Sequence, residues 1–378
     1  MDIKNYTKQN VTIAVLGSHS ALDVCRGAKD EGFKTLVIVE KGRDKTYAKY
    51  FKTKGPSASS GRASLGCVDE VLYVDKFKDI LSLKIQNELK KRNCIFIPHR
   101  SFEVYVNDYD AIEKKFNIPV FGNKKLLRLE ERTENPNQYD LLERAKIKYP
   151  KIFKDPKEID RLVIVKVAEK ERGFERAFFL VNSYQAYNHE SATLINEGKF
   201  TESAFKSAVI EEFILGAQVN FNFFFSKVNN RLELIGTDTR RQTNLDGLLR
   251  ITGNFQSQIM RDNKINIKYE EAGHISVTVL ESLLEQAYSI GERFIAASRE
   301  MLKPGVIGPF SLQSFITPGP PKKDIVVFDV SPRMPGSPGI SATPYSNYLF
   351  GQSLSMGRRV AMEIKEAIDK NKLKEITT

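Results

Sequence analysis

The spacing of short apolar runs along the chain constrains its fold more than any other feature of the sequence. In the first third, apolar runs typical of strands lie at residues 11–16, 35–39, 71–74, 95–97 and 120–121. The stretches between them leave room for helices, and residues 22–29 carry a helical pattern. Strands divided by helices indicate a parallel sheet, because parallel neighbours need a long crossover connection. We therefore expect a doubly wound α/β sheet over residues 1–125.

Beyond residue 125 the expected strands follow one another more closely. They lie at residues 162–167, 177–181, 209–214, 219–225 and 232–237. The pair Asn229-Asn230 is typical of a hairpin turn between the last two. A second hairpin is expected across Pro318-Gly319-Pro320. Connections this short favour antiparallel sheets, so the rest of the chain is expected to be α+β, with a long amphipathic helix over residues 283–301.

Composition excludes several classes of protein. No apolar run in the 378 residues approaches the 18 or so that a membrane span needs. The three cysteines lie far apart without a C-x-x-C pair, which favours a reducing cytoplasm over a disulfide framework. The net charge of +11 suits anionic partners, although a lysine-rich solvated surface explains it equally well. Because basic residues are scattered among acidic ones, nucleic-acid binding is the least favoured function.

Small and polar residues follow the ends of several strands in the first third. Gly17, Ser18 and His19 come between the first strand and a helix, where free backbone N–H groups form an anion pocket. Arg43 follows the second strand and Ser101 follows the fourth. The carboxyl ends of parallel strands meet at one edge of a sheet, so these residues predict a nucleotide pocket. Alternatively, His19 caps its own helix and Arg43 lies in an ordinary turn.

A second group of candidates lies in the antiparallel part. Lys166 sits inside the apolar run VIVKV, where a lysine needs an anion or must reach an edge. The acidic segment 211–214 leads to Gly216, which suggests a strand followed by a hinge. Gln313 and Asp329 lie on the two strands of one hairpin, and their oxygens suit Mg²⁺ bound to nucleotide phosphates. The alternative for Gln313 is a buried, hydrogen-bonded side chain.

This order of a lysine strand, an acidic hinge strand and an oxygen-bearing hairpin resembles the ATP-grasp enzymes. Within that superfamily, the chain looks like the archaeal PurP family, which formylates 5-aminoimidazole-4-carboxamide ribonucleotide (AICAR). The matching motifs are LGSH at 16–19, KGRD at 41–44, residues 98–102, VIVK at 163–166, residues 210–216, NLDGL at 244–248, residues 307–314, PYS at 344–346 and LSMG at 354–357. Together they cover nearly the whole chain.

The resemblance implies an ATP-grasp fold in three parts. Residues 1–125 would form a Rossmann-like domain, 126–205 the small lobe, and 206–378 the large lobe with metal and substrate residues. The implied enzyme is a carbon–nitrogen ligase of purine (IMP) synthesis that uses ATP, Mg²⁺ or Mn²⁺, and formate, through formyl phosphate. Its partners would be these small molecules, with no nucleic acid or membrane, and it would form a homo-oligomer in the cytoplasm.

The resemblance also assigns roles to individual residues. The residues implied to bind ATP are Lys166, Arg172, Glu211, Glu212, Phe213, Ile214 and Gln218. The implied metal ligands are Gln313 and Asp329. The residues implied to hold the ribonucleotide are Ser18, His19, Arg43, Ser101, Tyr345 and Ser346. The residues implied to act on formate and the reacting phosphate are Asp238, Arg240 and Arg333.

The chain departs from the family pattern at four places. Residues 167–176 hold a single glycine where a glycine-rich phosphate loop is usual, and MPGSP at 334–338 replaces an acid and paired glycines. Arg100 stands where a small residue is usual, and Asp329 replaces a glutamate. Two alternatives therefore stay open. One is a diverged paralogue that binds ATP-like or AMP-like nucleotides without formylation, and the other is an ATP-grasp ligase that uses another acid or amine.

Overall fold

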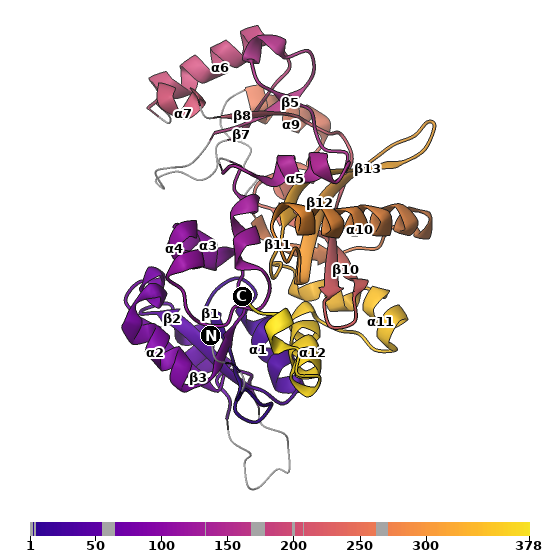
Figure 1. Cartoon of the computed structure of the whole chain (residues 1–378). Coiled ribbons are helices and arrows are strands. Elements are labelled where there is room, and N and C mark those ends of the chain that lie inside the picture. The colour runs from indigo at the N-terminus through magenta and orange to yellow at the C-terminus, as the bar shows by residue number, and fades with distance from the viewer. Residues whose placement is uncertain are drawn as a thin grey trace.

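The computed structural model describes the chain except for residues 1–2, 4, 55–64, 133, 168–177, 199–200, 207 and 262–270. Its described strands form three sheets, which Figure 1 shows one above another. The four-stranded sheet that contains the N-terminal strands lies at one end, and the four-stranded sheet within residues 152–212, with its helices, lies at the other (Figure 1). The five-stranded sheet lies beside and between them. Among the described residues, no helix has the length and apolar character needed to cross a membrane.

The N-terminal sheet is parallel, as expected, with the order β3-β2-β1-β4. Its strands are β1 (Thr12–Leu16), β2 (Lys34–Glu40), β3 (Glu70–Val74) and β4 (Cys94–Phe96). Its helices are α1 (Ala21–Asp30), α2 (Leu83–Lys91), α3 (Arg100–Val106) and α4 (Tyr109–Lys114). Every residue of β1 is buried, because β1 lies between two strands and under helices. The strand expected at 120–121 is wrong, since Val120 and Phe121 make isolated bridges, with Phe96 and Thr377, and not a ladder.

The second four-stranded sheet is antiparallel, with the order β5-β8-β6-β7. Its strands are β5 (Ile152–Phe153), β6 (Val163–Lys166), β7 (Phe178–Val181) and β8 (Val209–Glu212). The helices beside it in the sequence are α5 (Gln138–Arg144), α6 (Tyr184–Asn196) and α7 (Glu202–Lys206). Because β8 pairs with β5 and β6, we propose that the small lobe extends through Glu212 rather than ending at residue 205.

The five-stranded sheet has the order β11-β10-β9-β12-β13, and all its pairs are antiparallel. Its strands are β9 (Ala217–Ser226), β10 (Arg231–Gln242), β11 (Glu271–Ser276), β12 (Gly308–Thr317) and β13 (Asp324–Ser331). Both expected hairpins are present. Phe221 and Phe223 share one face and pack in the core that includes Phe294 of α10 (Leu284–Met301). The alternate residues Asn220 and Asn222 therefore point to the opposite face.

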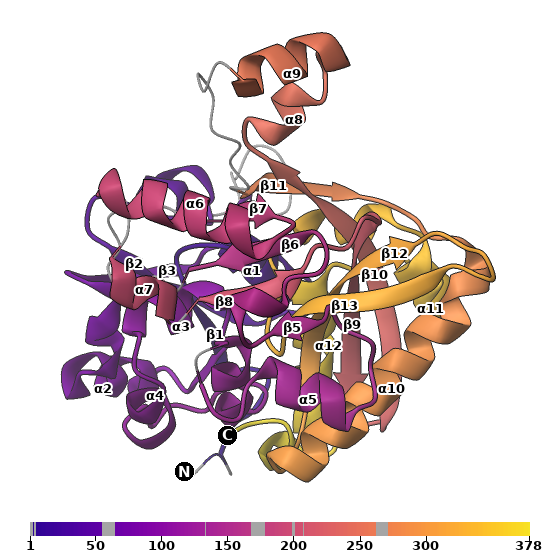
Figure 2. The ribbon, with the colours of Figure 1, turned by 90° about the horizontal axis from the view of Figure 1, so that it is seen from above.

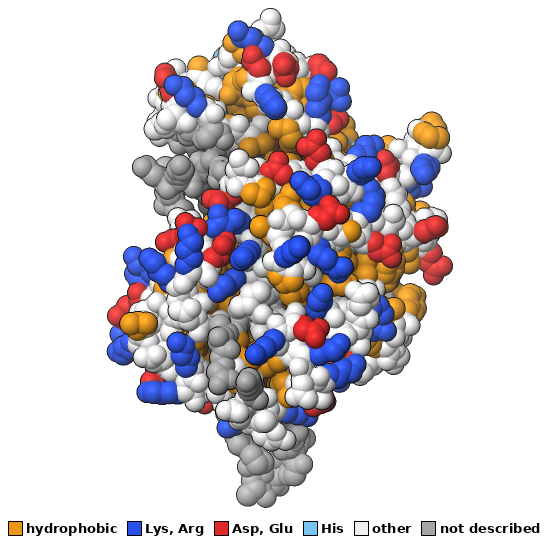
Figure 3. Space-filling model, in the orientation of Figure 1, with side chains coloured by type: hydrophobic (Ala, Val, Ile, Leu, Met, Phe, Trp, Pro, Cys, Tyr) orange, Lys and Arg blue, Asp and Glu red, His pale blue; other side chains and the backbone are white. Residues whose placement is uncertain are grey.

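Two short helices, α8 (Leu245–Leu248) and α9 (Gly253–Arg261), follow β10 and project away from the rest of the protein (Figure 2). The charges on the surface are mixed. On the face drawn in Figure 3, Lys and Arg side chains are interspersed with Asp and Glu. This distribution agrees with the interpretation of the net positive charge as a solvated surface.

The C-terminal segment returns to the N-terminal sheet. It contains α11 (Tyr345–Phe350) and α12 (Met356–Asp369), and Figure 1 shows α12 beside α1. The two helices approach so closely that a Cβ on Gly27 would lie 2.1 Å from the backbone N of Arg358. The backbone N–H of Gly357 donates to Oδ2 of Asp23 at 3.0 Å. Glycine at both positions thus fixes the N-terminal domain against the large lobe.

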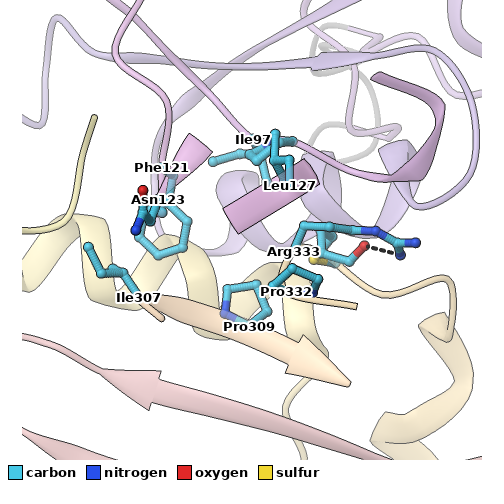
Figure 4. Close-up of a pocket in the computed structure, with 11 residues that line it drawn as sticks. Ile97, Phe121, Asn123, Leu127, Ile307, Pro309, Pro332 and Arg333 are labelled. Carbon is cyan, nitrogen blue, oxygen red and sulfur yellow. Dashed lines mark hydrogen bonds between the residues drawn. The ribbon is translucent and has the colours of Figure 1, made fainter. Parts of the chain in front are cut away.

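A second junction joins the end of β13 to the loop after β4. Met334 forms a parallel bridge with His99, and its N–H donates to the carbonyl of Pro98 at 3.3 Å. A cavity of about 10 Å³ lies beside this junction, with Arg333 and Pro332 at its edge (Figure 4). That volume is roughly what one water molecule needs, so this cavity is no substrate site. The junction nevertheless brings Arg333 to the carboxyl edge of the parallel sheet.

Candidate active site

One row of polar side chains crosses the whole five-stranded sheet. The pairing register places these residues side by side, one on each strand from β11 to β13: Ser276, Asp238, Asn220, Gln313 and Asp329. All but Ser276 carry a carboxylate or an amide, and directly opposite residues in a sheet share one face. Buried carboxylates and amides such as those of Asp238, Asn220 and Gln313 are costly unless they bind something, so we take this row as the floor of the site.

Asp238 organises one half of the row. Its buried carboxylate accepts hydrogen bonds from Nδ2 of Asn220 at 2.9 Å and Nδ2 of Asn222 at 2.6 Å. Since a carboxylate only accepts, it fixes which way both amides face. Each Oδ1 is thereby turned away from Asp238, and both are buried without a hydrogen-bond partner among the described residues. Buried polar atoms in folded proteins normally have partners, so the orphan acceptor that lies within the row, Oδ1 of Asn220, indicates a ligand.

His274, which the sequence analysis did not single out, completes the Asp238 cluster. Its Nδ1 donates to Oδ2 of Asp238 at 2.5 Å, and its Nε2 donates to Oε1 of Glu271 at 2.8 Å. Burial favours the neutral ring, but these two carboxylates outweigh it and raise the pKa of His274 to about 9. Arg240 lies opposite His274 in the register, with its Nε 3.4 Å from Oε2 of Glu271. The cluster therefore places two cations beside Asp238.

Lys166 is joined to Asp329 through a chain of side chains that crosses from the small lobe to the large lobe. Nζ of Lys166 lies 2.6 Å from Oε1 of Glu211, whose Oε2 accepts from the Tyr139 hydroxyl at 2.6 Å. Arg132 donates to the same hydroxyl at 3.1 Å and to Oδ1 of Asp329 at 2.8 Å. Burial, and then the nearby Arg132, lower the pKa of Lys166. Arg132 and Tyr139 are further site residues that the sequence analysis missed.

Gln313 and Asp329 meet, as their hairpin predicts, and their chemistry fits a divalent cation. They are direct cross-strand partners. Oε1 of Gln313 is buried without a hydrogen-bond partner among the described residues, while its Nε2 donates to Ser331 at 3.4 Å. A free amide oxygen beside a carboxylate is a donor set that Mg²⁺ accepts. The residues present therefore fit the metal, and their role as its ligands remains a prediction.

The segment expected to lead to a hinge begins in β8 and continues directly after that strand ends at Glu212. The carboxylate of Glu212 accepts from the backbone N–H of Lys151 and from Arg161. The N–H of Phe213 donates to the carbonyl of Leu162 at 2.9 Å. Ile214 is half-buried, and Gln218 pairs with Phe315 at the start of β9. Arg172 lies outside the described residues. The roles of this segment and of Arg172 in binding ATP remain predictions.

His19 lies at the carboxyl edge of the parallel sheet in a left-handed conformation, with φ of 50°. Its Nδ1 donates to Oγ of Ser20 at 2.6 Å, because that hydroxyl itself donates to the carbonyl of Pro335. Its Nε2 therefore carries no proton. The ring stacks on His99, with centroids 5.3 Å apart. His19 as a whole is exposed, but desolvation by the protein around its ring, and then the charge of Arg333, lower the pKa of His19, so the ring is neutral.

Ser18 and Ser101 accompany His19 at this edge. Ser18 is half-buried in the turn between β1 and α1. The backbone N–H of Ser101 donates to Nδ1 of His99 at 3.2 Å, and Nε2 of His99 donates to the carbonyl of Leu16 at 3.0 Å. The structure thus brings together three of the six residues expected to hold the ribonucleotide. Their contact with that ligand remains a prediction.

Arg333 reaches the same edge from the large lobe and is held by carboxylates. Its guanidinium donates to both oxygens of Glu130, at 3.0 and 2.5 Å, and lies 3.4 Å from Glu103. Arg100 lies 3.3 Å from Glu103 and 3.5 Å from Glu130. Burial, and then the charge of Glu130, raise the pKa of Glu103. Arg333 thus lies near His19, while the carboxylates of Glu130 and Glu103 neutralise its charge.

Three predicted residues make contacts away from this cluster. Arg43 donates to the Tyr105 hydroxyl at 3.0 Å and lies over the Phe77 ring. The buried Tyr345 hydroxyl accepts from the N–H of Val279 at 2.9 Å. Oγ of Ser346 is buried and accepts from the N–H of Leu354 at 3.0 Å. Each contact ties a loop to the fold, so binding of the ribonucleotide by Arg43, Tyr345 or Ser346 remains a prediction.

The sequence matches two family models. The model described as "Protein of unknown function (DUF1246)" matches residues 13–153, and the one described as "Domain of unknown function (DUF1297)" matches residues 186–378. Curated relatives are similar along the whole chain. A protein of Methanothermobacter thermautotrophicus is 38% identical over 378 residues, covering 100% of this chain and 97% of the relative. One from Methanopyrus kandleri is 36% identical over 376 residues, with the same coverage. Both are named 5-formaminoimidazole-4-carboxamide-1-(beta)-D-ribofuranosyl 5'-monophosphate synthetase.

Solved structures agree with this relationship. An IMP biosynthesis protein PurP from Thermococcus kodakaraensis superposes with a TM-score of 0.68 at 26% identity, covering 97% of this chain and 100% of that one. The biotin carboxylase domain of a Hydrogenobacter thermophilus 2-oxoglutarate carboxylase, solved with MgADP and bicarbonate, gives 0.60 at 12% identity over 94% of this chain and 70% of that one. The second likeness bears on the fold alone. The chain therefore has the ATP-grasp fold and belongs to the PurP family of 5-formaminoimidazole-4-carboxamide ribonucleotide synthetases.

Proposed function

We propose that this chain is an ATP-dependent ligase that formylates the amine of AICAR with formate, in the synthesis of IMP. The observation that carries the proposal is the end-to-end similarity to relatives named for the formylated product, at up to 38% identity. The site supports it, because two cations and a row of oxygen-bearing side chains lie where the small lobe meets the large lobe.

The chemistry requires activation of formate, because the carbon of a carboxylate is a poor electrophile. An oxygen of formate attacks the γ-phosphorus of ATP, the bond to the bridging oxygen breaks, and ADP leaves. The product is formyl phosphate. The amine nitrogen of AICAR then attacks the formyl carbon, inorganic phosphate leaves, and the nitrogen loses a proton. Such steps depend on positioning and on stabilisation of charge more than on covalent help from the protein.

Lys166 and Arg132 are the cations for the phosphates of ATP. In the structure their charges are neutralised by Glu211 and Asp329, at 2.6 and 2.8 Å. A triphosphate entering between the lobes would compete with these carboxylates, and Asp329 and Gln313 would hold the divalent metal. When bound, that metal neutralises charge on the transferred phosphoryl group. Binding of ATP thus replaces ion pairs inside the protein with ion pairs to the ligand.

The acyl-transfer end of the site lies around Asp238 and Arg333. The protonated His274 and Arg240 provide positive charge for formate and for the phosphate that forms on it, with Arg333 beside them. The neutral His19 offers an unprotonated Nε2, which is suited to accept an N–H of the ribonucleotide amine. Ser18, Ser101 and the N-terminal end of α1 are suited to its phosphate. We further propose a cytoplasmic enzyme that forms a homo-oligomer.

The test is release of phosphate from Mg·ATP by the purified chain. We expect release only when formate and AICAR are both present, together with a product heavier than AICAR by one formyl group. Acetate in place of formate is the control for the acid, and an imidazole ribonucleotide without the amine is the control for the acceptor. Release that needs neither substrate, or release supported equally by acetate, would contradict the proposal.

A further inference from the structure

The middle of the polar row is the part of the site whose groups are least satisfied. At its outer ends, each carboxylate has a cationic partner, which is Arg132 for Asp329 and His274 for Asp238. Between them lie Asn220 and Gln313, direct cross-strand partners on β9 and β12. Oδ1 of Asn220 and Oε1 of Gln313 are both buried, and neither has a hydrogen-bond partner among the described residues. Two orphan oxygens thus occupy neighbouring positions on one face.

The orientation of Asn220 is not arbitrary. Its Nδ2 donates to Oδ2 of Asp238 at 2.9 Å, and a carboxylate cannot accept from an amide oxygen. The amide therefore cannot flip, and its oxygen must face away from Asp238, while Gln313 occupies the opposite side of Asn220 in the register. Buried acceptors held in this way need either a donor or a cation. A cation satisfies both oxygens at once and also the carboxylate of Asp329, the next residue in the row.

We propose that Asn220 supplies a third oxygen ligand, beside Gln313 and Asp329, to the divalent cation that accompanies the nucleotide. The inference rests on the proposed function, because that function supplies the metal nucleotide. Amide and carboxylate oxygens are the ligands that Mg²⁺ and Mn²⁺ take in proteins. Because Asn220 lies on β9, the ligands of the cation would come from three neighbouring strands, β9, β12 and β13, and not from the β12–β13 hairpin alone.

Asn222 provides a matched control. It also lies on β9, donates to Asp238 at 2.6 Å, and carries a buried Oδ1 without a partner among the residues described. Its cross-strand partner on β12 is Ser311, however, and not Gln313. Asn220→Ser and Asn222→Ser each remove one hydrogen bond to Asp238. Only Asn220→Ser removes an oxygen next to Gln313.

The experiment measures binding of Mn²⁺ to the full chain by electron paramagnetic resonance, with the β,γ-imido analogue of ATP present. We expect Asn220→Ser to weaken Mn²⁺ binding by about tenfold or more. Asn222→Ser should leave it near the wild-type value. Without metal, the two variants should melt at similar temperatures. Mn²⁺ with the analogue should then raise the melting temperature of Asn222→Ser more than that of Asn220→Ser.

A third variant distinguishes two possible roles of Asn220, which are to bind the metal or only to orient Asp238. Asn220→Asp keeps an oxygen but loses the N–H that Asp238 accepts. If Asn220 is a ligand, this variant restores Mn²⁺ binding. If it only holds Asp238, Asn220→Asp binds Mn²⁺ no better than Asn220→Ser, and the inference is wrong. Equal weakening by Asn220→Ser and Asn222→Ser also overturns it. If the wild type binds no Mn²⁺ with the analogue, the proposed function fails together with the inference.

Discussion

Nζ of Lys166 lies 2.6 Å from Oε1 of Glu211, and both side chains are almost completely buried between the lobes. Through Tyr139 and Arg132 this pair is connected to Asp329 on the other lobe. A buried ion pair recovers its desolvation cost only when its partners stay matched. Replacing one partner therefore leaves an uncompensated charge, whereas a triphosphate replaces carboxylate by phosphate and keeps the lysine paired.

Removal of the Lys166 charge should abolish most of the phosphate release. We expect Lys166→Met to lower kcat/KM for ATP by about 10²–10³-fold, because a cation for the transferred phosphoryl group is lost. The same variant leaves Glu211 buried without its partner, so its melting temperature must be measured as well. Lys151→Met, an exposed lysine of the same lobe, is the control. Full activity in Lys166→Met would contradict the proposed function, and also the alternative of a ligase that uses another acid or amine.

Arg132 should matter more for binding of the metal nucleotide than for binding of the ribonucleotide. Arg132→Met removes the ion pair with Asp329 and also a cation for the phosphates, so we expect a rise in KM for ATP of about tenfold or more. The KM for AICAR should stay near the wild-type value, because Arg132 contacts Tyr139 and Asp329 and not the His19 cluster. Steady-state kinetics with each substrate varied in turn checks this. An equal rise in both KM values would point to a general loss of structure instead.

His274 should make stability fall with rising pH. Its pKa is raised from 6.5 to about 9, so the folded state binds its proton more tightly than the unfolded state. That contribution is fully present below about pH 6.5 and is lost as pH rises through about 9; its size is on the order of 3 kcal/mol. Urea unfolding of the wild type and of His274→Asn across this range measures it. The wild type should lose stability more steeply, and His189→Asn, on exposed α6, should follow the wild type.

The close contact between α1 and α12 should make Gly357 irreplaceable. A Cβ there would lie 2.2 Å from the backbone oxygen of Asp23, so one helix must move. We expect Gly357→Ala to lower the free energy of unfolding by about 3 kcal/mol. Gly247→Ala is the control, because nothing lies within 4 Å of a Cβ at that position in α8. Urea unfolding of both variants checks the prediction, and equal stabilities would show that the helices separate easily.

The sequence predicted the sheets well because their signals are local. Alternation along β9, the turn at Asn229-Asn230 and the lysine in β6 can all be seen within a few residues. The strand expected at 120–121 was wrong because an apolar pair alone does not form a ladder, and the bridge of Val120 with Phe96 is an isolated one. The other partner of Val120 is the C-terminal Thr378, whose proximity nothing local indicates.

The site was predicted less completely, because its key contacts depend on strand register and on long-range docking. The role proposed for Asn220 depends on its two cross-strand neighbours, which are Asp238 on one side and Gln313 on the other. His274 is an isolated histidine in the sequence, and only the pairing of β10 with β11 brings it to Asp238. Arg333 was identified by resemblance, but its pairing with Glu130 was not, since the two come from different domains.

Gly336 should control the position of His19. A Cβ on Gly336 would lie 2.7 Å from Nε2 of His19, so Gly336→Ala must displace the ring from its stack on His99. Since His19 is expected to contact the ribonucleotide and not ATP, we expect the KM for AICAR to rise by about tenfold. The KM for ATP should change little. Gly339→Ala, three residues further along the chain, is the matched control, because its Cβ would meet only Oγ of Ser276, at 3.2 Å. If Gly336→Ala leaves both KM values unchanged, the His19 ring either tolerates displacement or does not touch the ribonucleotide, and its assignment to this site fails.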